Sequence, residues 1–185
     1  MINGLAMMRD EESDSLWDHM TGECFEGALE GQRLEFWPVG LTSVSAELTR
    51  HPNTILLKSD YRSPGQFLFR RIWYGNNILD RHVRIPPPFR PTMHRKIDPR
   101  RAEQEQGFGI VVDDVGKYYP LASLPKNGTI EDQWHDGRTV RIERDALDGM
   151  PFATWVDDGE APMQLLTRWY GFSFTYPNCE IYGAG

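Results

Sequence analysis

The sequence predicts a β-rich α+β fold, and three observations predict it. Residues 109–112 form a β-branched run and residues 117–119 an aromatic run, with a polar turn between them that contains Asp113 and Asp114. Residues 129–134 and 139–142 flank a second turn, whose Asp136-Gly137 pair suits the positive φ values of a tight hairpin. The helical patterns, in contrast, are few and short. Two β-hairpins therefore dominate the expected structure.

The remaining elements follow from turn and capping residues. Thr42 or Ser43 can cap a helix that runs to about Arg50, because a hydroxyl accepts a hydrogen bond from the first free N–H groups. Asp-Gly pairs at 148–149 and 158–159 bracket a strand over residues 152–156. Pro162 suits the first turn of a second helix, which we expect to reach about Tyr170. A one-turn helix is expected over residues 121–124.

A short motif that occurs twice in the sequence predicts two related units. His51-Pro52-Asn53 and residues 176–178 (Tyr-Pro-Asn) are 125 positions apart, and each triplet follows a predicted helix and enters a predicted strand. We expect a first, partial unit over residues 1–61 that lacks a front half, a connector over residues 62–106, and a second unit over residues 107–185. A chain of 185 residues is about one domain long, so these parts should form one compact body.

The charge is distributed unevenly along the chain. The net charge is −7, yet residues 62–101 hold ten of the 20 basic residues against two acidic ones, which makes this stretch +8 and the rest −15. The stretch is also rich in proline and aromatic residues, a composition that favours extended geometry over regular elements. We therefore expect the basic connector to lie across the acidic body of its own chain or of a second copy, with self-association.

Two other interpretations of the connector compete with this one. The arginines could bind an anion or an acidic ligand, for which the candidates are Arg70, Arg71, Arg81 and Arg84. The connector could also bind nucleic acid through arginines and stacking aromatics. The −15 carried by the other residues repels phosphate at long range, so nucleic acid is the weaker alternative.

Composition and motifs exclude several classes of protein. No stretch approaches the roughly 18 consecutive apolar residues of a membrane span, and the first residues do not form a complete signal peptide. The expected location is the cytoplasm, with export as the alternative if a natural leader is missing. Cys24 and Cys179 are far apart in the sequence and are expected to be buried thiols. No dinucleotide fingerprint, P-loop, nucleophile elbow or metal-ligand spacing is present, so we expect no cofactor and no metal.

Several short motifs follow one another in a specific order along the chain. In the first half these are Ser-Leu-Trp at 15–17, Thr-Gly-Glu at 21–23, Gly-Ala-Leu-Glu-Gly at 27–31, Arg-Leu-Glu at 33–35 and His-Pro-Asn-Thr at 51–54. In the second half they are 109–112, 119–121, 131–132, 169–170 and 177–182. The order of these motifs resembles the domain of unknown function 3179 family of bacteria and archaea. The resemblance implies a tandem-repeat fold of unknown activity. Many family members carry an upstream Cys-Pro-x-Cys segment, absent here, so no metal or redox role carries over. Glu131 also stands where the family usually has Asn.

We expect the chain to act as a ligand-binding or protein-interaction module. A site between the two units would combine aromatic contact area with polar anchors, here Asp132 and His19. The candidate lining residues are Trp17, His19, Tyr119, Asp132, Trp134 and Trp169. The alternative is a hydrolase-type enzyme, which needs a His and a carboxylate converging in one concave site between the units.

Overall fold

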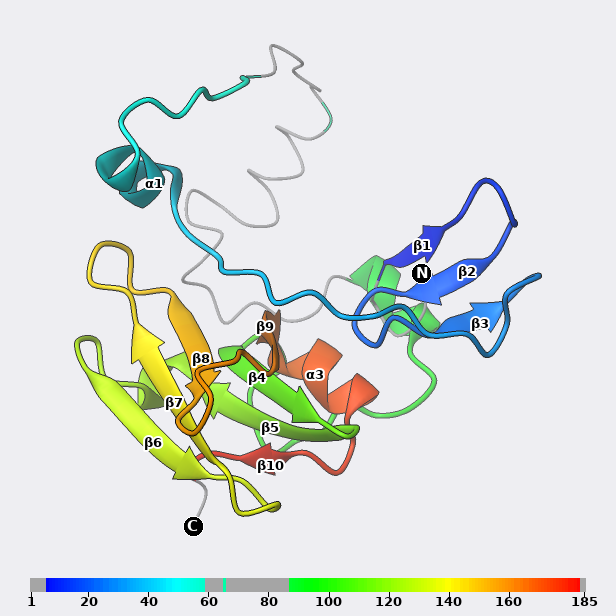
Figure 1. Cartoon of the computed structure of the whole chain (residues 1–185). Coiled ribbons are helices and arrows are strands. Elements are labelled where there is room, and N and C mark those ends of the chain that lie inside the picture. The colour runs from blue at the N-terminus through cyan, green and yellow to red at the C-terminus, as the bar shows by residue number, and fades with distance from the viewer. Residues whose placement is uncertain (1–5, 59–64, 66–86, 184–185) are drawn as a thin grey trace.

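A computed structural model describes residues 6–58, residue 65 and residues 87–183 (Figure 1). Its strands are β1 (Met7–Arg9), β2 (Leu16–Asp18), β3 (Cys24–Glu26), β4 (Gln106–Val112), β5 (Val115–Pro120), β6 (Thr129–Gln133), β7 (Thr139–Arg144), β8 (Pro151–Trp155), β9 (Met163–Arg168) and β10 (Glu180–Ile181). Its helices are α1 (Val44–Arg50) and α3 (Trp169–Thr175), with the 3-10 turns η2 (Pro87–Thr92) and η3 (Leu121–Ser123). The protein is a β-rich α+β protein, as predicted.

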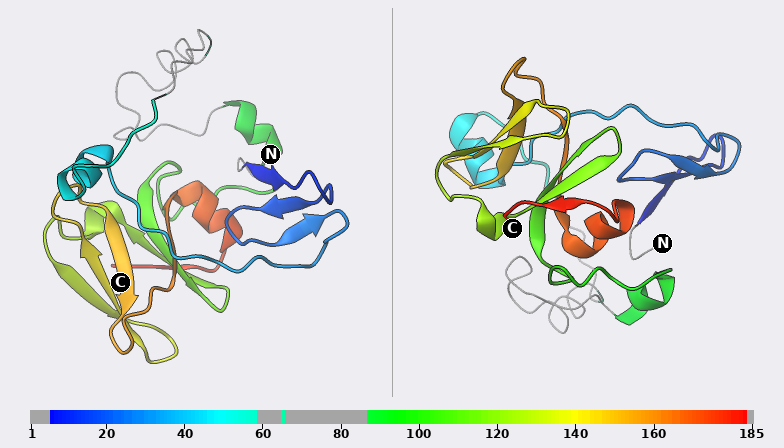
Figure 2. Two further views of the ribbon diagram at one scale, coloured as in Figure 1. Left: turned by 45° about the horizontal axis from the view of Figure 1, so that its top comes forward. Right: turned by 90° about the horizontal axis from the view of Figure 1, so that it is seen from below.

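The larger part of the structure has three layers, with a four-stranded sheet in the middle. This central sheet has the order β10-β5-β4-β9, in which β10 pairs parallel to β5 and the other pairs are antiparallel. The antiparallel sheet β6-β7-β8 covers one face, and α3 covers the other (Figures 1 and 2). Both predicted hairpins are confirmed, as β4–β5 and β6–β7.

Each face of the central sheet has its own apolar core, because side chains alternate along a strand. The core between the two sheets contains Phe108, Ile110, Tyr119, Leu124, Trp134, Val140, Ile142, Ala153 and Trp155. The core beneath α3 contains Met20, Val111, Tyr118, Trp169, Phe172, Tyr176 and Cys179. On this second face β4 presents Gly107 and Gly109, and the glycines leave room for aromatic rings.

The predicted helix over residues 162–170 is wrong for most of its length. Residues 163–168 are the strand β9, and α3 begins only at Trp169. An isolated helix of this length is marginal in water, whereas β9 pairs with β4 along its whole length and places Leu165 and Met163 against the α3 core. Sheet pairing therefore outweighs the local helical pattern. The one-turn helix after Pro120, the helix at 44–50 and the strand near 152–156 are confirmed.

A side-chain amide joins the two sheets at their common edge. Gln164 of β9 donates from Nε2 to the carbonyl of Ala153 in β8 (3.0 Å), and its Oε1 accepts from the Ala153 N–H (2.8 Å). Ala153 is fully buried, so neither of its backbone groups can turn to bulk water. The amide of Gln164 thus replaces the backbone of a neighbouring strand.

We predict that Gln164→Leu destabilises the protein. The substitution leaves a buried N–H and a buried C=O without partners, each costing about 1–3 kcal/mol. Urea unfolding followed by tryptophan fluorescence measures the loss. Gln133→Leu, on the exposed face of β6, is the matched control and should change the free energy of unfolding by no more than about 0.5 kcal/mol. Equal effects of the two substitutions would contradict the role of the Gln164 amide.

The N-terminal strands β1, β2 and β3 form a separate small antiparallel sheet beside α3 (Figures 1 and 2). Met20, in the turn after β2, is buried in the α3 core, and the Thr175 hydroxyl lies 3.5 Å from its sulfur. From this sheet an extended segment, residues 34–42, crosses to the other end of the molecule and leads into α1.

Helix α1 is held against the turn between β7 and β8 by polar contacts. Ser43 caps the helix by accepting from the Ala46 N–H at 3.1 Å. Asp148 accepts from the Ser43 N–H and from the Thr42 hydroxyl, both at 2.7 Å, and Arg50 forms an ion pair with Asp145. Among the described helices, none is long and apolar enough to cross a membrane.

We predict that α1 detaches from the β7–β8 turn in acid. The hydrogen bond from the Ser43 backbone N–H is the main cause that lowers the pKa of Asp148 to about 2. Because the pKa is depressed in the folded state, the stabilisation is complete above the ordinary Asp pKa of about 4 and disappears as the pH falls through about 2. Amide exchange of Ala46 measured by NMR should accelerate across this window, and Asp148→Asn should remove that part of the pH dependence. A profile unchanged in Asp148→Asn would contradict the assignment.

The two helices and their exits have matching local geometry. Helices α1 and α3 are both seven residues long, and each begins 125 positions from the other. The residues that follow them, His51 and Tyr176, have φ/ψ values of −127°/78° and −120°/76°. Each donates its N–H to the carbonyl four residues earlier, at 2.7 and 2.8 Å, and each accepts a 3.0 Å bond from the N–H three residues later.

Two further pairs of turns, 135 and 137 positions apart, share a pattern of backbone hydrogen bonds. Asp10 and Asp145 each donate their N–H to the carbonyl five positions later, at 2.9 Å in both cases. Asp18 and Trp155 do the same at 2.9 and 2.8 Å. The helix exit in the second half leads into β10, which pairs with β5, whereas residues 55–57 after α1 are solvent-exposed.

Candidate functional site

Several hydrogen bonds fix the backbone of the turn after β2, and the turn directs side chains toward the central sheet. Asp18 accepts the backbone N–H groups of Met20 (2.7 Å) and Thr21 (3.2 Å) at its carboxylate. Gly22 has a φ of +71°, which favours glycine, and its carbonyl accepts the N–H of Leu34 at 2.9 Å. The turn is therefore rigid and is tied to the start of the extended segment.

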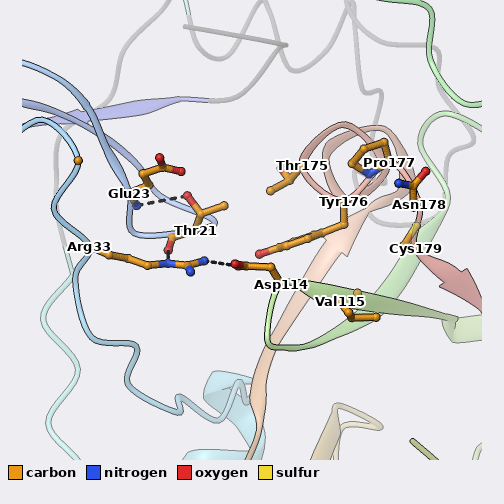
Figure 3. Close-up of a pocket in the computed structure, with 12 residues that line it drawn as sticks. Thr21, Glu23, Arg33, Asp114, Val115, Thr175, Tyr176, Pro177, Asn178 and Cys179 are labelled. Carbon is orange, nitrogen blue, oxygen red and sulfur yellow. Dashed lines mark hydrogen bonds and ion pairs between the residues drawn. The ribbon is translucent and has the colours of Figure 1, made fainter. Parts of the chain in front are cut away.

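An ion pair connects this turn to the hairpin β4–β5. Arg33 donates from Nη2 to Asp114 Oδ1 (2.7 Å) and from Nε to the Thr21 carbonyl (3.0 Å) (Figure 3). The hydrogen bond from Arg33 lowers the pKa of Asp114, and the same bond raises the pKa of Arg33. Asp113 and Asp114 have φ values of +49° and +62°, as the two central residues of a tight type I′ hairpin require. The strained turn directs Asp114 at the N-terminal sheet.

Two cavities meet at this ion pair. The first has a volume of about 560 Å³ and lies between the N-terminal sheet, the β4–β5 turn and the end of α3 (Figure 3). Its walls carry the polar groups of Thr21, Thr175, Tyr176 and Asn178. Burial raises the pKa of Tyr176 to about 12, and its hydroxyl donates a weak hydrogen bond to Met163 Sδ at 4.0 Å.

The second cavity is larger, about 860 Å³, and more apolar. It runs along β9, beneath the segment of residues 34–39 and beside Trp155. Its residues include Met20, Leu34, Phe36, Trp37, Val39, Val111 and Leu165. Thr21, Arg33 and Asp114 line both cavities, so the two are contiguous. Each volume falls within the range of about 300–1,000 Å³ that is usual for ligand sites.

The charge along the larger cavity is acidic once internal ion pairs are removed. Arg33 pairs with Asp114, and Arg138 pairs with Asp157 and Asp158. Glu35 and Asp113 also line the cavity, and within the described part of the chain neither carboxylate has an ion-pair partner. The cavity therefore offers two exposed negative charges next to an apolar wall.

The predicted site residues do not lie in one place. Tyr119 and Asp132 come together, since the Tyr119 hydroxyl donates to Asp132 Oδ2 at 2.7 Å, and Lys117 Nζ lies 2.7 Å from the same oxygen. Burial, and then the bond to Asp132, raise the pKa of Tyr119. Trp134 lies in the same inter-sheet core, and its buried Nε1 has no hydrogen-bond partner in the described structure.

The other three predicted residues are elsewhere. Trp169 is the first residue of α3, is fully buried and donates its Nε1–H to the carbonyl of Asp98 at 2.8 Å. Trp17 is buried within β2, and His19 is exposed on the turn that follows. Of the six candidates, His19 is the one that lines either of the two cavities, namely the larger.

Two of the described histidines, His51 and His135, are exposed and line neither of the two cavities. His51 lies 4.0 Å from Glu47 on the exposed side of α1, and His135 packs against the Trp134 ring in a hairpin turn. His19 lines the larger cavity, and His82 lies outside the described residues. No group of three or more potential metal ligands occurs among the described residues.

The described part of the basic connector binds its own chain. Arg90 pairs with Glu103 and Arg101 with Glu105, at 2.9 and 2.6 Å. The four anion-binding candidates Arg70, Arg71, Arg81 and Arg84 lie outside the described residues.

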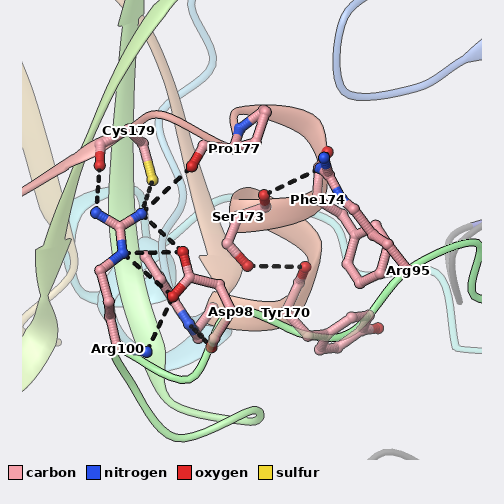
Figure 4. A network of polar contacts seen from close by, with 9 residues as sticks. Arg95, Asp98, Arg100, Tyr170, Ser173, Phe174, Pro177 and Cys179 are labelled. Carbon is pink, nitrogen blue, oxygen red and sulfur yellow. Dashed lines mark hydrogen bonds and ion pairs between the residues drawn. The ribbon is translucent and has the colours of Figure 1, made fainter.

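Two further arginines of the connector hold the end of α3 (Figure 4). Arg100 pairs with Asp98, donates to the Cys179 carbonyl at 3.0 Å and lies over the Trp169 ring at 5.3 Å. Arg95 donates to the carbonyl of Phe174 and lies over its ring at 5.0 Å. Cations beside free carbonyls at a helix C-terminus are favourable, so these side chains act as caps.

Apart from His19, sequence reasoning missed the residues that line the two cavities. Thr21 and Arg33 lie in motifs that support the family resemblance, and the Asp113-Asp114 turn was expected, but no spacing connects them. Arg33 and Asp114 are 81 positions apart, and only the packing of the N-terminal sheet against α3 brings them together.

A family model described as "Protein of unknown function (DUF3179)" matches residues 1–166 of the chain. No curated protein and no solved structure matches the chain.

Proposed function

The chain belongs to the DUF3179 family, whose function is unknown, and from that premise we propose that it is a binding module whose ligand occupies the two contiguous cavities. One observation carries the proposal: the Arg33–Asp114 ion pair joins a polar cavity to a larger apolar one at the junction of the N-terminal sheet and the central sheet. A site with an apolar wall and a few convergent polar groups is the usual form of a ligand site.

The proposed ligand has an apolar part and a polar end. The apolar part would lie against Met20, Leu34 and Leu165 in the larger cavity, and the polar end would reach the hydroxyls of Thr175 and Tyr176 in the smaller one. The exposure of Trp37 (86%) and Val39 (64%) along the rim supports this proposal, since exposed apolar side chains that gather in one place mark binding sites.

The experiment uses the uncharged dye Nile red, whose fluorescence rises in apolar cavities. The proposal expects a saturable rise with the folded protein at neutral pH and a loss of most of that rise in Val39→Glu. Leu147→Glu is the matched control, because Leu147 is similarly exposed (54%) but lies in the β7–β8 turn away from both cavities. Equal dye binding by the two variants would contradict the proposed site.

We also propose that the two halves are copies of one unit. The matched lengths of α1 and α3, their matched exits and the two matched pairs of turns support this proposal. It would make residues 38–43 the counterpart of β9.

A further inference from the structure

Strand β9 is an edge of the central sheet. The residue that follows it shows which backbone groups of β9 bond to β4 and which face away from the sheet. The order of the sheet ends at β9. Glu105 directly precedes β4 and Trp169 directly follows β9. The Trp169 N–H donates to the Glu105 carbonyl at 2.9 Å, so these two residues form a hydrogen-bonded pair of the β4–β9 ladder. Bonded and non-bonded pairs alternate in an antiparallel ladder. Leu165 and Thr167 therefore bond to β4, while the N–H and C=O of Gln164 and Leu166 point to the free edge.

These outward backbone groups border the larger cavity. Gln164 and Leu166 both line it, and residues 34–39 form the opposite wall. The Leu166 N–H and C=O have no hydrogen-bond partner in the described part of the chain. A free strand edge that opens into a cavity is a template for one more strand.

The side chains around the edge specify the chemistry of that strand. Glu35 and Asp113 supply carboxylates without ion-pair partners in the described structure, whereas the neighbouring Arg33 and Arg138 are already neutralised by aspartates. The aromatic ring of Trp37 is 86% exposed on the opposite wall and can contact the aliphatic stem or the charged end of a Lys or Arg side chain. Charge complementarity therefore favours a basic occupant.

We propose that an extended segment of a partner protein, carrying lysine or arginine, adds as a strand to the free edge of β9. This inference rests on the proposed function and names the class of its ligand. The main-chain groups of Gln164 and Leu166 would supply hydrogen bonds, the apolar wall would accept alternate side chains, and Glu35 and Asp113 would select for positive charge.

The test uses a synthetic heptapeptide of alternating lysine and valine, acetylated and amidated at its ends. Calorimetry should detect binding that weakens with salt, and a matched peptide with glutamate in place of lysine should bind at least tenfold more weakly. In a strand only alternate amides face the partner. N-methylation of one alternate set of amides should therefore weaken binding at least tenfold, and N-methylation of the other set should not.

Two measurements on the protein locate the peptide. Amide exchange of Leu166 and Gln164 should slow at least tenfold when the heptapeptide binds. Leu166→Pro should remove binding, because proline lacks the outward N–H but leaves the bonds of Leu165 and Thr167 to β4 in place. If Leu166→Pro does not fold, the exchange measurement on the native chain still decides.

Several outcomes would overturn the inference. Three of them are the absence of heptapeptide binding, equal effects of the two N-methylated sets, and no protection of the Leu166 amide by the peptide. The fourth is protection of the Leu166 amide that appears without peptide as the protein concentration rises. That result would assign the edge of β9 to a second copy of the chain. If the native protein binds the dye, Val39→Glu removes most of that binding and the peptide tests fail, the proposed function stands and the strand-addition inference is wrong.

Discussion

Replacing Gly109 with alanine is expected to cost about 3 kcal/mol of folding free energy, although only one methyl group is added. A Cβ at this position would lie 2.3 Å from Cε2 and 2.7 Å from Cδ2 of Phe172, far inside van der Waals contact. The Phe172 ring is fully buried between β4 and α3 and packs against Tyr118 and Tyr176 at centroid distances of 5.5 and 5.1 Å. It has no room to retreat, because protein cores are close-packed.

Chemical denaturation of Gly109→Ala measures the effect, and a double-mutant cycle identifies the cause. Phe172→Ala alone should cost about 3–5 kcal/mol through the cavity it leaves. With the ring gone, Gly109→Ala should cost at least 1 kcal/mol less than it does in the native chain. Gly40→Ala is the control, since a Cβ there would be 3.9 Å from its nearest neighbour. Additive losses in the cycle would show that the ring is not the obstacle.

Replacing Asp132 with alanine is expected to cost about 3–5 kcal/mol, the range for breaking a buried ion pair from one side. The side chains of Asp132 and Lys117 are only 17% and 15% exposed, and their charged groups are 2.7 Å apart. The substitution leaves the Lys117 ammonium with Glu180, 3.4 Å away and 63% exposed, and leaves the buried Tyr119 hydroxyl without its acceptor. The residual partner places the loss toward the lower end of the range.

The adjacent residue provides a matched control. Glu131 also forms an ion pair, with Arg141 at 2.8 Å, but the two side chains are 51% and 40% exposed. Exposed pairs contribute about 0–1 kcal/mol, so Glu131→Ala should have little effect on thermal unfolding. Similar melting temperatures for Asp132→Ala and Glu131→Ala would mean that the Asp132 network does not stabilise the fold.

The local parts of the fold were predictable because each is specified by residues next to one another. The Asp-Gly pair between β6 and β7 sets its turn, and Ser43 caps α1 with its own hydroxyl. The segment 163–168 was mispredicted because its state depends on β4, more than 50 positions earlier in the sequence. Local pattern cannot reveal a partner at that distance.

In the candidate site too, the sequence predicts local features but not the contacts between distant segments. Tyr119 and Asp132 were predicted as polar and aromatic site residues, and their hydrogen bond belongs to a packed network beside the inter-sheet core. Most residues that line the cavities come from the turn after β2, the segment of residues 33–39, the β4–β5 turn, β9 and the end of α3. No periodicity links these five segments, so sequence analysis had no signal with which to group them.

The sequence by itself determined the β-rich class, the hairpins, the first helix, the uneven charge and the family. The tertiary structure alone decided that β9 is a strand, that Arg33 meets Asp114 and that two cavities open beside them. The physical reason is the range of the interactions. Turns and caps are satisfied within a few residues of the chain, whereas sheet edges, ion pairs and cavities depend on segments that only packing of the apolar cores brings together.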